Sequence, residues 1–233
     1  PSGEFDKRVV LLTRELGEIS AFARGARRPR SQLLAATGPM AFGTFELYEG
    51  RNSYTLVRAS IEAYFLEIAE DYDKVCLAAY FLEKAEYYGI ENSDESQRLL
   101  LLYQTLRALA SDKFSPRLLR IIYEIRTMGI NGEYPDVFSC AACGRKEGLA
   151  YFHMGRRAVI CSDCQPVEGG RPISASALYA FQFILSAPMK KLFSFRLTDP
   201  VEEEVWQLLR EYQGRYLEHS FKAESFLSSP GKG

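Results

Sequence analysis

Four of the five cysteines lie in two C-x2-C pairs that are separated by seventeen residues. They are Cys140, Cys143, Cys161 and Cys164. Two cysteines three positions apart on a tight turn direct both sulfur atoms to one point, and two such pairs complete a tetrahedron of thiolates around Zn²⁺. Because four sulfur ligands leave no open position for water, we expect a structural zinc ion and not a catalytic one.

The segment between the two pairs predicts a zinc ribbon. LAYFHM and RAVI have strand composition and are joined by Gly155, and His153 is expected to be a partly exposed strand residue. Nearby cations would offset the charge of the thiolates: Arg145, Lys146, Arg156 and Arg157. Two redox-active C-x2-C pairs are the alternative, but such pairs usually occur singly and on a βαβ background that this chain lacks.

A second candidate site is a short basic segment near the N-terminus. Arg24, Arg27, Arg28 and Arg30 lie within seven residues, and no acidic residue occurs between Glu18 and Glu46. Guanidinium groups match phosphate oxygens by fork geometry and stack on bases. Since the net charge is only −1, nucleic-acid binding has to come from local clustering of this kind. A solvated basic loop is the alternative.

Motifs for catalysis and for membrane insertion are absent. The chain has no phosphate-binding loop, no dinucleotide fingerprint, no zinc-protease helix and no nucleophile elbow, and neither histidine begins the H-x-E of a zinc deaminase. We therefore expect no enzymatic activity. No apolar run approaches 18 residues, and the start lacks a signal-peptide pattern, so we expect a soluble protein of the cytoplasm with no membrane partner.

The elements that must position these residues fall into a β-rich part and a helical part. Runs at 8–13, 18–25, 42–49 and 53–63 alternate apolar and polar residues between turn segments, which predicts an antiparallel barrel or sandwich. A five-stranded barrel needs one strand more, which we expect upstream of Pro1. Helices are expected over residues 73–88, 94–110, 115–128, 174–187 and 200–220.

Cap residues define the expected helix ends. Asp94, Ser115 and Ser174 are the expected N-caps, and Gly89 and Gly129 are expected where the first and third helices end. The segment PVEGGRP after the last C-x2-C pair is expected to be a linker, and Cys76 is expected to be a small buried hydrophobic residue.

The chain resembles a known family over nearly its whole length. The run LTRELGEISAFARGARRPRS, followed by GTFELYEGRNSYTLVRASI, closely resembles the N-terminal oligonucleotide-binding (OB-fold) barrel of RecO, a bacterial recombination mediator family. The helices, the C-x2-C pairs and the tail YLEHSFKAESFL follow in the family's order. The first run is the most specific part, because C-x2-C pairs occur in many families and some RecO proteins lack them.

The resemblance implies an α+β multidomain fold. Residues 1–70 would form the OB-fold β-barrel, with its first strand missing. Residues 71–135 and 173–228 would form an all-α domain, and residues 136–172 would be an inserted four-cysteine zinc ribbon with its linker. The matching DNA-contact residues would be Arg24, Arg27, Arg28 and Arg30.

The implied function is that of a DNA repair and recombination mediator. Such a protein binds single- and double-stranded DNA, anneals complementary strands, and works with RecR and single-stranded DNA-binding protein to load RecA, which places it at the nucleoid. For the acidic tail of the single-stranded DNA-binding protein, Lys190, Lys191, Arg196 and Lys222 are candidate contacts, with a solvated face as the alternative. The alternative function is a zinc-ribbon docking scaffold with incidental nucleic-acid contact.

Aromatic residues of the predicted barrel could stack on bases. The rings within the four predicted strands are Phe22, Phe42, Phe45, Tyr48 and Tyr54. Because alternation turns about half of them inward, we expect core packing for most and select Phe22 or Tyr48 as the stacking candidates.

Overall fold

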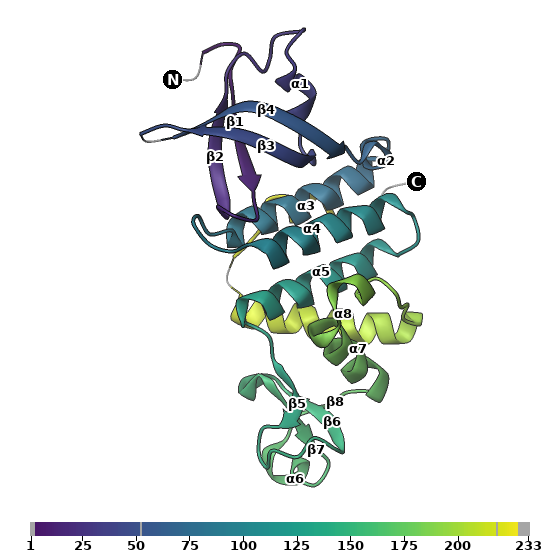
Figure 1. Ribbon diagram of the computed structural model, residues 1–233. Helices are drawn as coiled ribbons and strands as arrows, with labels where there is room; N and C mark the ends of the chain where they lie inside the picture. Colours follow the sequence, from purple (N-terminus) through teal and green to yellow (C-terminus); the bar gives the residue numbers. More distant parts are fainter. Residues whose placement is uncertain (1–2, 52, 218, 228–233) are drawn as a thin grey trace. The chain divides into compact units, whose positions relative to one another are not determined.

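The structure is a computed structural model that describes residues 3–51, 53–217 and 219–227 (Figure 1). The chain divides into two compact units, Pro1–Ser111 with Phe221–Gly233, and Asp112–Ser220. The boundaries of these units differ from those of the predicted barrel, helical domain and ribbon. That three-part division remains a prediction. No helix among the described residues is both long and apolar enough to span a membrane.

The first unit begins with a four-stranded sheet. Its strands are β1 (Lys7–Leu12), β2 (Glu18–Ala23), β3 (Phe42–Glu49) and β4 (Tyr54–Ala63), in the order β1-β2-β4-β3. All four correspond to predicted runs. The expectation of a wholly antiparallel sheet is wrong for one pair, because β2 and β4 run parallel. The chain passes from β2 through α1 (Leu33–Ala36) to the β3–β4 hairpin, and β4, not β3, is the neighbour of β2.

Alternation along the strands gives this sheet one buried face. Ile19, Ala21 and Ala23 of β2 are buried on that face. Ala23 packs in a core cluster with Ala26 and Leu56, against which three partly buried side chains pack: Leu33, Phe45 and Leu47. Residues one position away along each strand therefore project from the opposite face.

Helices complete the first unit. They are α2 (Leu66–Ala69), α3 (Tyr72–Tyr88), α4 (Ser96–Ala110) and α9 (Glu224–Leu227). Cys76 is buried in α3, as expected. The predicted N-cap of α4 is one residue off: Glu95 occupies that position, while Asp94 accepts a hydrogen bond from the Ser96 N–H at 3.0 Å.

Three helices form the core of the second unit. They are α5 (Pro116–Asn131), α7 (Ala175–Ser186) and α8 (Asp199–Tyr216), and each packs against the other two. Ser115 and Ser174 are the N-caps, as predicted, each accepting a hydrogen bond from a backbone N–H of the first turn. The predicted end of α5 at Gly129 is wrong, because the helix continues to Gly132, whose φ of 71° stops it.

A second sheet follows α5 (Figure 1). Its strands are β5 (Asp136–Cys140), β6 (Leu149–His153), β7 (Ala158–Cys161) and β8 (Arg171–Pro172), in the order β5-β7-β6-β8. The predicted strands β6 and β7 are joined by a 3-10 turn, Met154–Arg156, that contains Gly155. The predicted linker is not extended chain: it includes most of α6 (Gln165–Glu168) and strand β8.

Candidate metal centre and nucleic-acid interface

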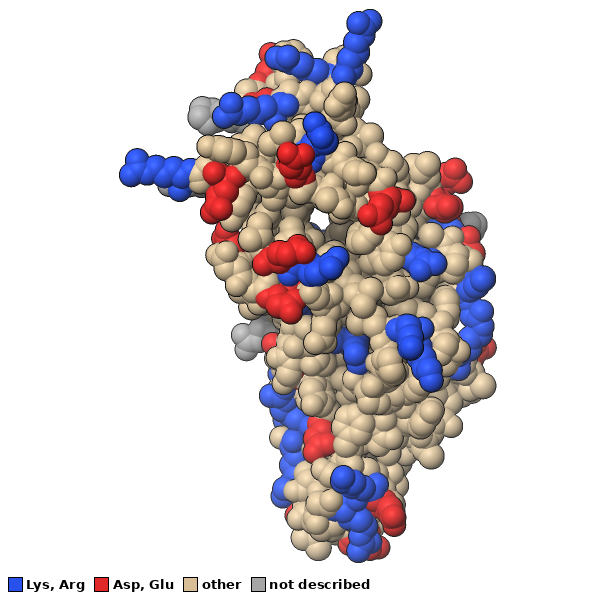
Figure 2. Space-filling model, viewed as in Figure 1, with Lys and Arg blue, Asp and Glu red and all other residues tan. Residues whose placement is uncertain are grey.

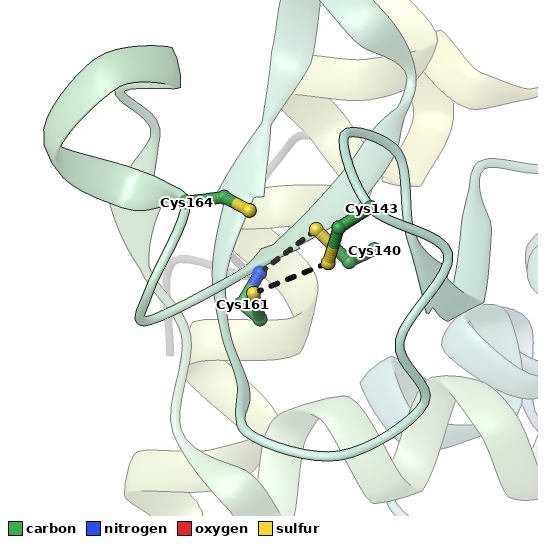
Figure 3. Close-up of side chains that lie close together, drawn as sticks. All are labelled: Cys140, Cys143, Cys161 and Cys164. Atoms are coloured by element: carbon green, nitrogen blue, oxygen red, sulfur yellow. Dashed lines mark hydrogen bonds between the residues drawn. The ribbon is translucent and has the colours of Figure 1, made fainter.

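The second sheet brings the four predicted cysteines together. Cys140 ends β5, Cys161 ends β7, and Cys143 and Cys164 lie in the turns that follow. Figure 3 shows the four side chains converging on one point. Their sulfur atoms all lie within 4.8 Å of one another, and the sulfur atoms of Cys143 and Cys161 are 3.7 Å apart. Tetrahedral Zn–S bonds of about 2.3 Å would separate the sulfur atoms by about 3.8 Å, so the donor set fits zinc.

Backbone groups favour the ionised form of Cys140. Burial opposes ionisation, but the N–H groups of Cys161, Cys143 and Ala142 point at the sulfur and lower the pKa of the thiol to about 6. The Cys161 N–H to Cys140 sulfur distance is 3.3 Å. Gly144 makes the turn possible, since it takes a φ of 74° and donates to the Cys140 carbonyl at 2.8 Å. Such a turn holds a thiolate ready for a cation.

The neighbouring basic residues have more specific roles than charge balance. Arg145 forms an ion pair with Asp163. The pKa of Arg145 is raised mainly by Asp163, with smaller contributions from Cys161 and Cys143. Arg156 pairs with Glu168. Arg157 donates to the Tyr212 hydroxyl at 2.9 Å. His153, at the end of β6, accepts a hydrogen bond from the Arg156 N–H at 3.1 Å and is not a member of the cysteine cluster.

The predicted basic segment is a turn that follows β2. The backbone is held in place: Gly25 donates to the Asp6 carboxylate at 2.7 Å, and Arg27 donates to the Phe5 carbonyl at 2.9 Å. Ala26 is fully buried and anchors the turn in the core. The Gly25 N–H, with the nearby Arg24 and Arg28 charges, lowers the pKa of Asp6. The turn therefore has a fixed path.

The four guanidinium groups of this turn face solvent. Arg24, Arg27, Arg28 and Arg30 are all exposed, and none of them pairs with a described carboxylate within 4.0 Å. The guanidinium carbon of Arg28 lies 5.8 Å from the centre of the Phe5 ring. On the face shown in Figure 2, basic side chains project from the unit that holds this sheet, with acidic ones between them. A phosphate backbone would find four exposed cations here, two of which, Arg24 and Arg28, lie near the Asp6 carboxylate.

Exposure separates the candidate stacking rings. Phe22 is 38% exposed and Tyr48 is 66% exposed, whereas Phe42, Phe45 and Tyr54 are partly buried. Phe42 stacks on Tyr103 of α4, with ring centres 4.2 Å apart.

The four basic residues selected for an acidic tail are not gathered in one element. Lys190 and Lys191 are exposed in a 3-10 turn, Met189–Lys191. Arg196 donates to the Lys113 carbonyl and lies over Phe114. Lys222 belongs to the other unit. Of these four residues, only the two lysines of the 3-10 turn form a local cluster.

These features define a class of protein: a small β domain with an exposed arginine turn, followed by helices and a four-cysteine ribbon. The family model "Recombination protein O N terminal" matches residues 1–65, and "Recombination protein O C terminal" matches residues 69–225. The chain belongs to the RecO family.

Relatives match along almost the entire chain. DNA repair protein RecO of Acetivibrio thermocellus is 30% identical over 230 residues, covering 98% of this chain and 92% of the relative. DNA repair protein RecO of Symbiobacterium thermophilum is 29% identical over 229 residues, covering 96% and 90%. That of Bacillus pumilus is 28% identical over 227 residues, covering 97% and 88%.

Proposed function

We propose that this chain is a DNA repair and recombination mediator that binds single- and double-stranded DNA, anneals complementary strands and helps load the recombinase. Family membership supports the repair role, since the relatives are named DNA repair protein RecO. The observation that carries the binding role is the arginine turn, where a fixed backbone presents Arg24, Arg27, Arg28 and Arg30 to solvent.

The N-terminal sheet is the proposed OB-fold. The sheet consists of two antiparallel pairs that are joined by a parallel β2–β4 contact, and α1 lies in the connection between the pairs. This topology fits strands two to five of a five-stranded Greek-key barrel. In such barrels the face of strands two and three, here β1 and β2, binds oligonucleotides. The arginine turn leaves from the end of β2. We propose residues 1–70 as the nucleic-acid-binding domain, 71–135 with 173–228 as the helical domain, and 136–172 as the ribbon with its linker.

The ribbon is the proposed site of one structural zinc ion, held by Cys140, Cys143, Cys161 and Cys164. A bound zinc ion would bring β5, β7 and the turns after them to a single centre. The site would leave no coordination position for substrate, so we propose that the protein acts without catalysing a reaction. Its proposed partners are RecR and single-stranded DNA-binding protein, with the RecA filament as an indirect one. Lys190 and Lys191 are a proposed contact for the acidic tail of the single-stranded DNA-binding protein.

Titration of the chain with labelled single-stranded and double-stranded DNA at several salt concentrations tests the binding role. Affinity should fall with salt on both, and for single strands the slope of log affinity against log salt should be about 0.7 for each phosphate contact. Complementary oligonucleotides should anneal in the presence of the chain without ATP. Weak binding that does not depend on salt would contradict the proposal and favour the docking scaffold.

A further inference from the structure

The outer face of the N-terminal sheet carries a row of side chains that crosses all four strands. The register places Arg8 of β1 opposite Phe22 of β2, Phe22 beside Thr55 of β4, and Thr55 opposite Tyr48 of β3. Because paired residues lie on the same face, these four side chains project together. Arg8 confirms this locally, since its guanidinium donates at 2.9 Å to the hydroxyl of Ser20, which is two residues before Phe22.

Large apolar side chains are exposed along this row. Tyr48 is 66% exposed and Phe22 is 38% exposed. Two valines on the same side add to the exposed apolar surface: Val10, opposite Ser20, is 44% exposed, and Val57, at the β-bulge of β4, is 54% exposed. The core of this sheet lies on the other face, around Ala23 and Leu56. Packing within the sheet therefore does not account for the exposure of these side chains.

Cations border the row on the side of β1 and β2. Arg8 ends the row, and Arg24, the first residue after β2, continues the same outward alternation. Farther along, Glu46 lies opposite Arg58, so that acid has a cation across the strand pair. The surface thus combines two aromatic rings with arginines at its border, which is the composition that binds single-stranded nucleic acid.

We infer that Phe22 and Tyr48 form a base-stacking platform for single-stranded DNA, separate from the phosphate contacts of the arginine turn. The two rings are on strands two spacings apart, about 10 Å across the sheet, so each takes its own base. Duplex DNA hides its base faces in the helix and cannot use the rings. The platform therefore confers a preference for single strands, whereas the arginine turn serves both forms. This inference rests on the proposed function.

Tyr48→Leu is the most direct test, because the side chain is mostly exposed and the change keeps an apolar residue on the strand. The probe is a labelled oligothymidine. Loss of one stacked base should weaken binding by about 5- to 150-fold. The salt slope should stay the same, because no phosphate contact is removed. Tyr48→Phe keeps the ring and should bind as the unaltered chain does.

An abasic oligonucleotide of equal length identifies what the ring contacts. It keeps every phosphate but has no base, so the Tyr48→Leu penalty should disappear on it, and it should be absent on duplex DNA as well. Tyr72→Leu removes another exposed tyrosine of the same unit, on α3, and should leave binding unchanged. Circular dichroism should show that each variant is folded.

Two different failures can be told apart. If the unaltered chain binds oligothymidine with salt dependence but Tyr48→Leu binds equally well, or loses as much affinity for the abasic strand, the stacking platform is wrong and the proposed function stands. If the unaltered chain binds no DNA at any salt concentration, both are wrong.

Discussion

The cysteine cluster predicts the metal content of the protein. The four sulfur atoms lie within 4.8 Å of one another, and zinc bound there would contribute its binding energy to local folding. We expect one zinc ion per chain by elemental analysis. Cys140→Ser should lose the metal and make residues 136–172 sensitive to limited proteolysis, because a buried sulfur that receives the Cys161 N–H is removed.

Cys76→Ser is the matched control, since Cys76 is a buried cysteine of α3 outside the cluster. It should keep one zinc ion per chain. A metal-free preparation that is fully folded, with disulfides between the four clustered cysteines, would contradict the zinc site.

Protonation of Glu18 should change the stability of the fold. Burial raises the pKa of Glu18 to about 7, and Glu86 and Glu95 add to the rise while Arg98 opposes it. One of its carboxylate oxygens is buried without a partner among the described residues. In the unfolded chain the carboxyl titrates near its usual 4.5. The folded state therefore binds the proton more tightly, and stability falls as pH rises from about 4.5 through about 7.

Glu18→Gln should remove this pH dependence, because an amide has no charge to bury. In urea unfolding followed by circular dichroism, the variant should be more stable than the unaltered chain at pH 8, and the difference should vanish near pH 4. Glu15→Gln, a change at an exposed carboxylate in the turn before β2, is the control and should show no such crossover. An equal gain for Glu18→Gln at both pH values would point to packing and not to titration.

For two glycines of the helices, the same substitution should change stability in opposite directions. Gly132 ends α5 at a φ of 71°, whereas Gly214 lies inside α8, and a Cβ at either site would meet no atom within 4 Å. Gly132→Ala should destabilise the second unit by about 1 kcal/mol, because a side chain is strained at that φ. Gly214→Ala should stabilise it by up to about 1 kcal/mol through helix propensity. Changes of the same sign in thermal unfolding would refute the assignment of the α5 end.

The end of α5 at Gly132 shows which features of a helix the sequence can predict and which it cannot. Apolar spacing predicted the five long helices and the four N-terminal strands, because periodicity reports which face is buried. It did not choose between Gly129 and Gly132, since either glycine can end a helix and only the observed φ decides. Strand β8 was missed because two residues cannot show a period. Strand β5 was missed as well, although it has as many residues as the predicted strand β6.

Spacing predicted the convergence of the four cysteines, but not the relations between distant residues. The C-x2-C pairs implied convergence of four sulfur atoms, and the structure brings them together. The binding candidate Arg8, which follows Lys7 in the sequence, was missed. Its place beside Phe22 comes from the β1–β2 register, and the position of Tyr48 in the same row comes from the parallel β2–β4 contact, which local sequence does not encode.

For the whole molecule, the distribution of charge matters more for DNA binding than the net charge does. The chain has 29 basic and 30 acidic residues, so its net charge provides no attraction for DNA. Counterion release depends on the number of phosphates that are contacted locally. A turn with four exposed arginines can therefore supply much of the affinity of a chain whose net charge is −1.

The most direct test of this account is the salt dependence of single-stranded DNA binding when Arg27 and Arg28 are both changed to Ala. If each arginine neutralises one phosphate, the slope of log affinity against log salt should become shallower by about 1.4, twice the value of ~0.7 per contact. Binding to unrelated sequences should weaken about equally. The fold should be intact, because both side chains are exposed.

Lys190→Ala with Lys191→Ala is the matched control, because it removes an adjacent exposed pair of cations from the other unit. The account predicts an unchanged slope for the lysine pair and a slope shallower by about 1.4 for the arginine pair. A well-folded arginine variant with unaltered affinity and slope would contradict it, and would mean that the turn is only solvated.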